Sequence, residues 1–287
     1  MAAIQKDVVV QMDKIADFHS PIYSPVENKD GDLFVVSTDG YVYQILENGI
    51  SPLYNTSGQP TGLVFDAEAG SYIADSAHQA ILSQGLSAAK ADKFEVIKDF
   101  EGVPLLGPNS LIITKDANTL FFTDSGVFGH TSIANPKGSV FTVDLEANSI
   151  KPLIYQLLAC PYGLAVSPSE SALYVSELCK NRVLRLVQYP SGIYHCSTFY
   201  QFSGRFGPTA VAMHNKGCLF VARYDFPECS KDGVITVIRE HGDLEGEIVI
   251  PNGPEITGLY FSHNNPDLLY VTEKTTNSLY KVLVNIK

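Results

Sequence analysis

The sequence predicts an all-β fold, a six-bladed β-propeller with four antiparallel strands in each blade. Short apolar strands alternate with turn residues along nearly the whole chain, and each group opens on a proline: Pro21, Pro60, Pro108, Pro161, Pro208 and Pro254. These prolines follow one another at intervals of 39, 48, 53, 47 and 46 residues. A period of this size with four strands per unit is typical of propeller blades.

The clearest unit runs from Gly107 to Asp124. A tight Gly-Pro opening leads into a strand at 110–114, a turn at 115–118 and a second strand at 120–123 that ends on a carboxylate. The unit at 20–57 repeats the plan, with Asp-Gly and Asn-Gly turns that are strong hairpin signals. Between Asp124 and Gly138 lies a long insertion, and long loops in compact folds often carry function.

We expect one domain, residues 1–287, with blades near 20–57, 58–105, 106–158, 159–204, 205–252 and 253–287. The last unit shows only three strands. The β-branched segment at 5–18, which has no local partner, is expected to supply the fourth strand. Closing the ring in this way removes an exposed sheet edge.

Composition limits the function. Of the 287 residues 45% are hydrophobic and 18% charged, as in an ordinary globular protein, and the formal net charge is −11. An acidic chain is disfavoured as a nucleic-acid binder or as a ligand of anionic membranes. No secretory leader and no apolar run of roughly 20 residues is visible. The five cysteines form no CxxC pair and are expected to be reduced thiols, so we predict a cytoplasmic protein.

Propeller geometry predicts where a site would lie, because the first strand of each blade lines a central channel. Residues just after each proline and residues ending each second strand are expected to face it. The first set is Tyr23, Thr61, Asn109, Tyr162, Thr209 and Thr257. The second set is Ser37, Asp75, Asp124, Glu177, Arg223 and Glu273.

Two stretches carry a family resemblance. Residues 107–125 contain Gly-Pro-Asn-Ser and end on Leu-Phe-Phe-Thr-Asp-Ser, and residues 160–185 run from Cys-Pro-Tyr-Gly-Leu-Ala to Asn-Arg-Val-Leu-Arg. They resemble the third and fourth blades of the regucalcin/gluconolactonase and strictosidine synthase-like propellers, and the second stretch is closest to the strictosidine synthase-like branch.

In the lactonase branch, the resemblance implies a divalent metal, usually calcium, held by oxygen ligands in the channel. The four ligand positions of that branch fall here on Tyr23, Asn109, Tyr162 and Thr209. Only the asparagine is kept, and both carboxylates are gone. We therefore predict no metal and no other cofactor, with calcium expected only if the chain is an active lactonase.

The strictosidine synthase-like branch uses a glutamate on the first strand of the last blade as its acid and base. Here Glu255 lies close to that position but out of phase with the strand.

Other polar residues allow two interpretations. Asp75, Asp124, Glu177 and Glu273 would form an acidic ring for a cation, or they would bind neighbouring backbone amides, which we favour. Arg223 is expected to pair with Glu177 or Asp124. His130, in the long insertion, is the histidine placed to reach the cavity as a base.

Two functions remain open. The first is a binding or scaffold module with an altered central site, taking a small molecule in the channel or a protein partner on a propeller face. The second is a hydrolase of lactones or esters, with Asn109, Asp124, Glu177 and Arg223 as candidate catalytic residues. In either case the candidate ligand-binding residues are Tyr23, Tyr162, Thr209, Glu273 and His130.

Overall fold

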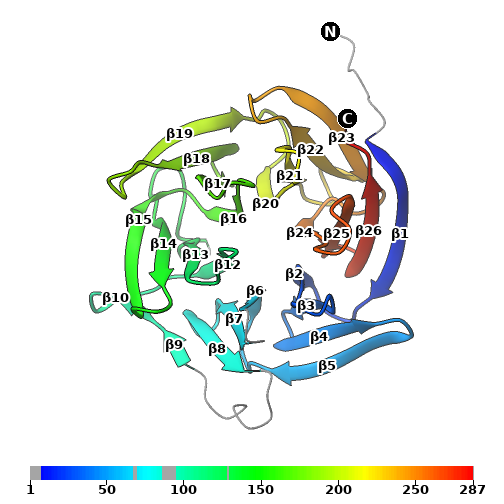
Figure 1. The fold of residues 1–287 in the computed structure, drawn as a ribbon. Coiled ribbons are helices and arrows are strands. Elements are labelled where there is room, and N and C mark those ends of the chain that lie inside the picture. The colour runs from blue at the N-terminus through cyan, green and yellow to red at the C-terminus, as the bar shows by residue number, and fades with distance from the viewer. Residues whose placement is uncertain (1–7, 67–69, 86–94, 128, 287) are drawn as a thin grey trace. The chain divides into compact units, whose positions relative to one another are not determined.

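The computed structural model describes residues 8–66, 70–85, 95–127 and 129–286. Every regular element in these ranges is a β-strand (Figure 1). The described residues therefore contain no helix that is long and apolar enough to cross a membrane. Of the 26 strands in these ranges, 24 form six four-stranded antiparallel sheets, the predicted blades of a β-propeller.

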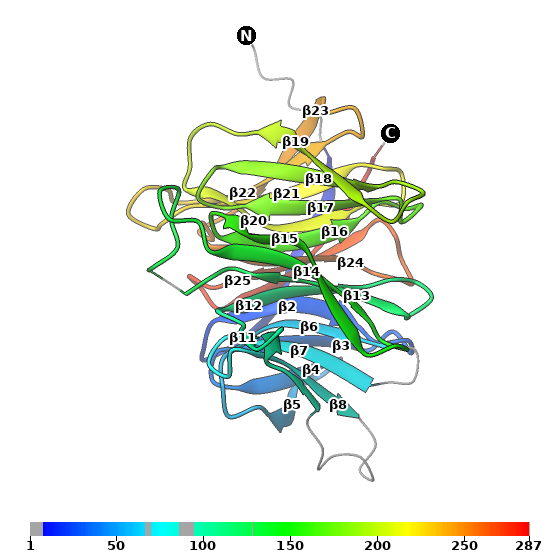
Figure 2. The ribbon, with the colours of Figure 1, turned by 90° about the vertical axis from the view of Figure 1, so that its left-hand side faces the viewer.

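The first three sheets follow one another along residues 22–158. They contain β2 (Ile22–Glu27), β3 (Leu33–Ser37), β4 (Tyr41–Leu46) and β5 (Gly49–Asn55); β6 (Pro60–Phe65), β7 (Gly70–Asp75), β8 (Ala80–Gly85) and β9 (Glu95–Ile97); and β12 (Pro108–Ile113), β13 (Thr119–Asp124), β14 (Gly138–Asp144) and β15 (Ser149–Leu158). Within the last of these sheets the strands lie side by side in chain order (Figures 1 and 2).

The other three sheets contain β16 (Pro161–Val166), β17 (Ala172–Glu177), β18 (Arg182–Gln188) and β19 (Tyr194–Gln201); β20 (Gly207–Met213), β21 (Leu219–Tyr224), β22 (Gly233–Ile238) and β23 (Leu244–Ile250); and β24 (Ile256–Phe261), β25 (Leu268–Glu273), β26 (Ser278–Val284) and β1 (Val9–Asp17). The pairing of β1 with β26 confirms that an N-terminal strand completes the last blade. Residues 5–7 of the predicted segment lie outside the described ranges.

One small element was not predicted. A two-stranded hairpin, β10 (Asp99–Phe100) with β11 (Val103–Pro104), joins the second sheet to the third. Over the residues that the structure describes, each of the six four-stranded sheets lies within one of the expected blade ranges.

The chain divides into two compact units, one of residues 1–22 with 165–287 and the other of residues 23–164. Both borders fall inside a first strand, β2 or β16. The expectation of a single domain stays a prediction.

Each unit is held by apolar residues that alternate along its strands. In the 23–164 unit, Leu111, Leu120 and Phe122 pack with Phe141 in a buried cluster. The rings of Phe122 and Phe141 stack with centroids 5.0 Å apart. Such pairs add to the burial of apolar area, which is the main source of stability for these sheets.

Hydroxyl groups join each sheet to the next one within a unit. Thr61 Oγ1 donates to the Asn109 carbonyl at 3.1 Å, and Thr123 Oγ1 donates to the Tyr162 carbonyl at 2.7 Å. In the other unit, Thr209 Oγ1 donates to the Ile256 carbonyl at 2.8 Å. The accepting carbonyls belong to first strands, so these bonds satisfy backbone groups that the sheet ladder leaves open.

Candidate functional site

Asn109 lies in an irregularity at the start of β12. Pro108 pairs with Asp124 and Leu111 pairs with Phe122, and the register shifts between these two pairs. Bulges of this kind re-aim side chains and are frequent beside active sites. Asn109, the second residue of β12, is half-buried.

Ser125 fixes the orientation of the Asn109 amide. Asn109 Nδ2 donates to Ser125 Oγ at 3.0 Å, and the Ser125 hydroxyl donates its proton to the Pro161 carbonyl at 2.6 Å. A hydroxyl has one proton, so Ser125 accepts from Asn109 and the contact must be made by the amide nitrogen. The amide oxygen Oδ1 therefore faces away from Ser125.

Asp124 clamps the loops around Asn109. Its carboxylate accepts hydrogen bonds from the backbone N–H groups of Leu106 at 2.8 Å, Gly107 at 2.7 Å and Gly126 at 3.0 Å. Asp124 is 3% exposed, and burial raises the pKa of its carboxyl group, although the three amides act in the opposite direction. This geometry favours a positioning role over a catalytic one.

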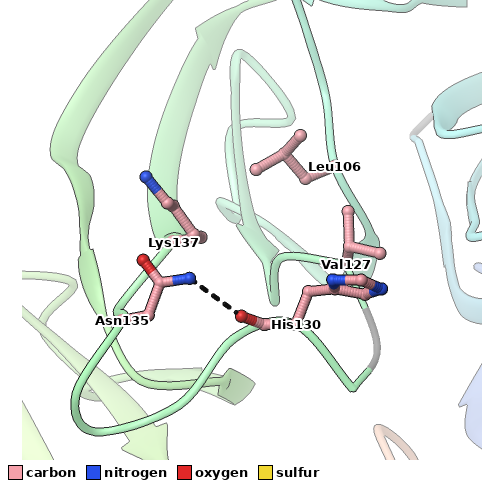
Figure 3. A pocket seen from close by; sticks show the side chains of 5 residues that line it. All are labelled: Leu106, Val127, His130, Asn135 and Lys137. Atoms are coloured by element: carbon pink, nitrogen blue, oxygen red, sulfur yellow. Dashed lines mark hydrogen bonds between the residues drawn. The ribbon is translucent and has the colours of Figure 1, made fainter.

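A cavity of about 360 Å³ lies next to this clamp (Figure 3). Leu106 lines it from the segment before β12, and Val127, His130, Asn135 and Lys137 line it from the long insertion after β13. The structure therefore places the predicted His130 at a cavity. The size is that of a small-molecule site.

The predicted first-strand residues differ in exposure. Tyr23 and Tyr162 are half-buried, like Asn109. Thr209 is only 2% exposed, and its hydroxyl proton is donated to the Ile256 carbonyl. The geometry of Thr209 is that of a link between sheets, in contrast to the predicted ligand-binding role.

The buried carboxylates at the ends of second strands bind nearby groups. Asp75 accepts from the Gln59, Ala77 and His78 amides, and Glu273 accepts from the amides of Thr275 and Thr276. These contacts support the backbone-binding interpretation that the sequence analysis favoured over an acidic ring.

Glu177 and Arg223 make different contacts from those expected. Glu177 is buried and forms ion pairs with Lys180 at 3.0 Å and Arg182 at 2.6 Å. Arg223 donates to the carbonyls of Ser203 and Gly204, and its guanidinium lies 4.0 Å from the Phe202 ring centroid. Burial lowers the pKa of Arg223. Arg223 is also not the last residue of its strand, because β21 ends at Tyr224.

Glu255 precedes β24, which begins at Ile256. Its carboxylate accepts from the Tyr224 hydroxyl and from Thr275 Oγ1, and it pairs with Lys274 at 3.1 Å. Glu255 therefore lies just before the first strand of the last blade, and three neighbours hold its carboxylate.

The residues at the four family ligand positions do not fit a calcium ion. Hard cations require several carboxylate or carbonyl oxygens. The four positions offer one amide oxygen at Asn109, two phenols at Tyr23 and Tyr162, and the engaged hydroxyl of Thr209. Among the described residues, no group of three histidine, cysteine or acidic side chains is arranged to hold a metal. No chemistry is therefore assigned to a metal in this chain.

Two residues of the site were missed from the sequence. Ser125 orients Asn109, and Lys137 lines the cavity. Ser125 directly follows Asp124 in the motif, but its hydrogen bonds depend on the neighbouring strand β16. Lys137 was visible as the one lysine of the 125–137 insertion.

Comparison with solved structures shows the same fold. A gluconolactonase from Xanthomonas campestris, XC5397, aligns with a TM-score of 0.77 and 20% identity, covering 97% of this chain and 91% of that one. The calcium-binding protein regucalcin from Agrobacterium tumefaciens aligns with a TM-score of 0.76 and 14% identity, covering 98% and 94% of the two chains.

Sequence similarity reaches curated lactonases over part of the chain. The lactonase drp35 of Staphylococcus haemolyticus is 29% identical over 147 residues, which are 50% of this chain and 42% of that protein. The drp35 lactonase of Staphylococcus aureus strain USA300 is 27% identical over 165 residues, 52% and 48% of the two chains. The similarity thus spans less than half the length of these relatives.

A family match extends over most of the sequence. Residues 24–275 match the family described as SMP-30/Gluconolactonase/LRE-like region. The matched range includes Asn109, Asp124 and the five residues that line the cavity. The chain belongs to the SMP-30/gluconolactonase/LRE-like family.

Proposed function

We propose that this protein is a hydrolase of lactones or related carboxylic esters, with its reaction centre at the start of β12. The observation that carries the proposal is the oriented Asn109 amide, fixed by Ser125 beside a cavity-lining loop. Family membership and similarity to drp35 lactonases support the substrate class.

Hydrolysis adds water to the acyl carbon and breaks the bond between that carbon and the ring oxygen. A proton of the water must be removed, and the departing oxygen must gain one. Histidine exchanges protons near neutral pH, so we assign water activation to His130 and hydrogen bonding to the bound ester or the attacking water to Asn109. Asp124 acts indirectly, because it holds the amides that position both neighbouring loops.

The test is an assay of γ- and δ-lactones and of aryl esters with the purified protein, with and without a metal chelator. We expect hydrolysis that persists after chelation and falls about 100-fold in His130→Gln, the lower range for loss of a general base. The control is His195→Gln, because His195 is exposed on the outer strand β19. Equal rates in His130→Gln and the wild-type protein would refute the role of His130.

A second function, a binding module without catalysis, is favoured by one observation. Three of the four family ligand positions carry residues that do not bind calcium. Under this alternative, none of the lactones or esters is hydrolysed, and the protein contains no stoichiometric metal. Activity that depends on stoichiometric calcium would contradict both the binding module and the chelator-resistant hydrolase.

A further inference from the structure

The strand β19 ends its sheet with an open backbone edge. The order of this sheet is β16-β17-β18-β19, so among the described strands β19 is hydrogen-bonded to β18 alone. Figure 1 shows β19 running along the outer side of β18. Alternate residues of an edge strand turn their N–H and C=O groups away from the sheet, and these groups are a template for pairing with a further strand.

Edge strands of soluble proteins usually carry charged residues or a proline, which discourage such pairing. The strands at the corresponding edge of the other five sheets follow this rule. β1 contains Asp13 and Lys14, β5 contains Pro52, β9 contains Glu95, β15 contains Lys151 and Pro152, and β23 contains Glu245 and Glu247. Of the six edge strands that the structure describes, β19 alone has no aspartate, glutamate, lysine, arginine or proline.

The first part of β19 is both regular and exposed. Residues 194–198 pair without interruption with residues 184–188 of β18, and the register shift of this ladder lies beyond them. The side chains at 195–198 are exposed. The turn before the strand adds two exposed apolar side chains, Tyr189 at 54% and Ile193 at 68%. Nothing in this stretch twists the edge away from an incoming strand, as a bulge would.

The same strand of a second copy is the partner that fits this edge. Tyrosine, threonine and phenylalanine favour extended structure, and they make up four of the eight residues of β19, which contains no glycine. Two β19 edges laid antiparallel satisfy each other's open backbone groups without bringing like charges together. Any of the other five edges would bring a charge or a proline to the contact.

We propose that β19 is a self-association edge, at which two copies of this chain join by antiparallel pairing of their β19 strands about a two-fold axis. One surface then makes both halves of the contact, which is the arrangement of most homodimers. Tyr189 and Ile193 lose exposed apolar area in the dimer. A single pair of edges is a small interface, so the association is weak and depends on concentration.

The first test is sedimentation velocity of the full chain from micromolar to millimolar concentration. Physiological ionic strength is used, because it screens the long-range repulsion that a net charge of −11 creates. We expect the monomer to give way to a dimer as the concentration rises. Ser197→Lys places two ammonium groups close together across the two-fold contact and should weaken dimerisation about tenfold or more. The matched control Ser51→Lys, on the edge strand β5, should dimerise like the wild-type protein.

Hydrogen exchange followed by NMR locates the contact without any substitution. In the dimer, alternate amides of residues 194–198 gain a hydrogen-bond partner, so their exchange should slow as the protein concentration rises. Amides of the β5 edge, residues 49–55, should exchange at a constant rate.

Three results would overturn the inference: a monomer at every concentration, a dimer of Ser197→Lys as strong as that of the wild-type protein, or a dimer whose 194–198 amides exchange as fast as those of the monomer. None of these measurements depends on catalysis, so their outcome is separate from that of the hydrolase proposal.

Discussion

Replacement of Asp124 probes the clamp that holds both sides of the candidate site. Asp124→Ala removes the acceptor of three backbone N–H groups. Two of the donors, Leu106 and Gly107, are half-buried and gain water as a partner, so we use the lower range of roughly 1 kcal/mol for each bond. The expected loss in the free energy of unfolding is about 3 kcal/mol.

Asp124→Asn separates hydrogen bonding from shape. The amide keeps one oxygen, which accepts from Gly107 and Gly126, but its NH₂ group meets the N–H of Leu106. One bond of the three is lost, and we expect a decrease of about 1–2 kcal/mol in the free energy of unfolding. The exposed Asp116, in the turn between β12 and β13, is the control, and Asp116→Ala is expected to cost less than about 1 kcal/mol.

The assay is urea unfolding at 25 °C. The chain contains no tryptophan and 15 tyrosines, so far-ultraviolet circular dichroism and tyrosine fluorescence are the suitable signals. The predicted order of stability is wild type, Asp124→Asn and Asp124→Ala. If Asp124→Ala were as stable as the wild-type protein, or lost less free energy of unfolding than Asp124→Asn, the stabilising role of the three hydrogen bonds to Asp124 would be refuted.

Three further predictions concern other parts of the chain. Thr209→Val is expected to lower the free energy of unfolding, measured with urea, by about 1–2 kcal/mol, because the Ile256 carbonyl loses its buried donor. Thr209→Ser keeps the hydroxyl and should lower the free energy of unfolding less. Equal losses in the two variants would contradict the hydrogen bond between the sheets. Burial lowers the pKa of His214 below its usual 6.5, so as the pH falls the unfolded chain binds the proton at a higher pH than the folded chain does. The free energy of unfolding should therefore fall as pH drops below 6.5, and His214→Gln should flatten that slope. Gly126→Ala should lower the free energy of unfolding more than Gly129→Ala. Both glycines have positive φ, but of the two only Gly126 would bring the added Cβ close to side chains, to within 3.0 Å. Equal unfolding midpoints for the two variants would contradict the close packing around Gly126.

Much of the fold followed from local patterns. Turn pairs such as Asp30-Gly31 and the recurring prolines mark the blades, and the unpaired strand near the N-terminus indicated the β1–β26 pairing. The β10–β11 hairpin escaped notice because two-residue strands leave almost no pattern. The cytoplasmic location stays a prediction.

The site was less predictable because its geometry depends on contacts between neighbouring sheets. Asn109 and His130 were identified from a motif and a long insertion. The role of Ser125 required the Pro161 carbonyl of the next strand, and the role of Thr209 required the Ile256 carbonyl. A sequence pattern places such residues on a strand but does not show which backbone group each hydroxyl meets.

Substitution of Asn109 is the most direct test of the central proposal. We predict that the wild-type protein hydrolyses lactones and that Asn109→Ala lowers kcat/KM about 100-fold or more, the range for losing one oriented polar group at a reacting centre. Asn118→Ala, at an exposed turn of the same sheet, should leave kcat/KM unchanged. Hydrolysis by Asn109→Ala at the wild-type rate, or no hydrolysis by the wild-type protein, would contradict the proposed function.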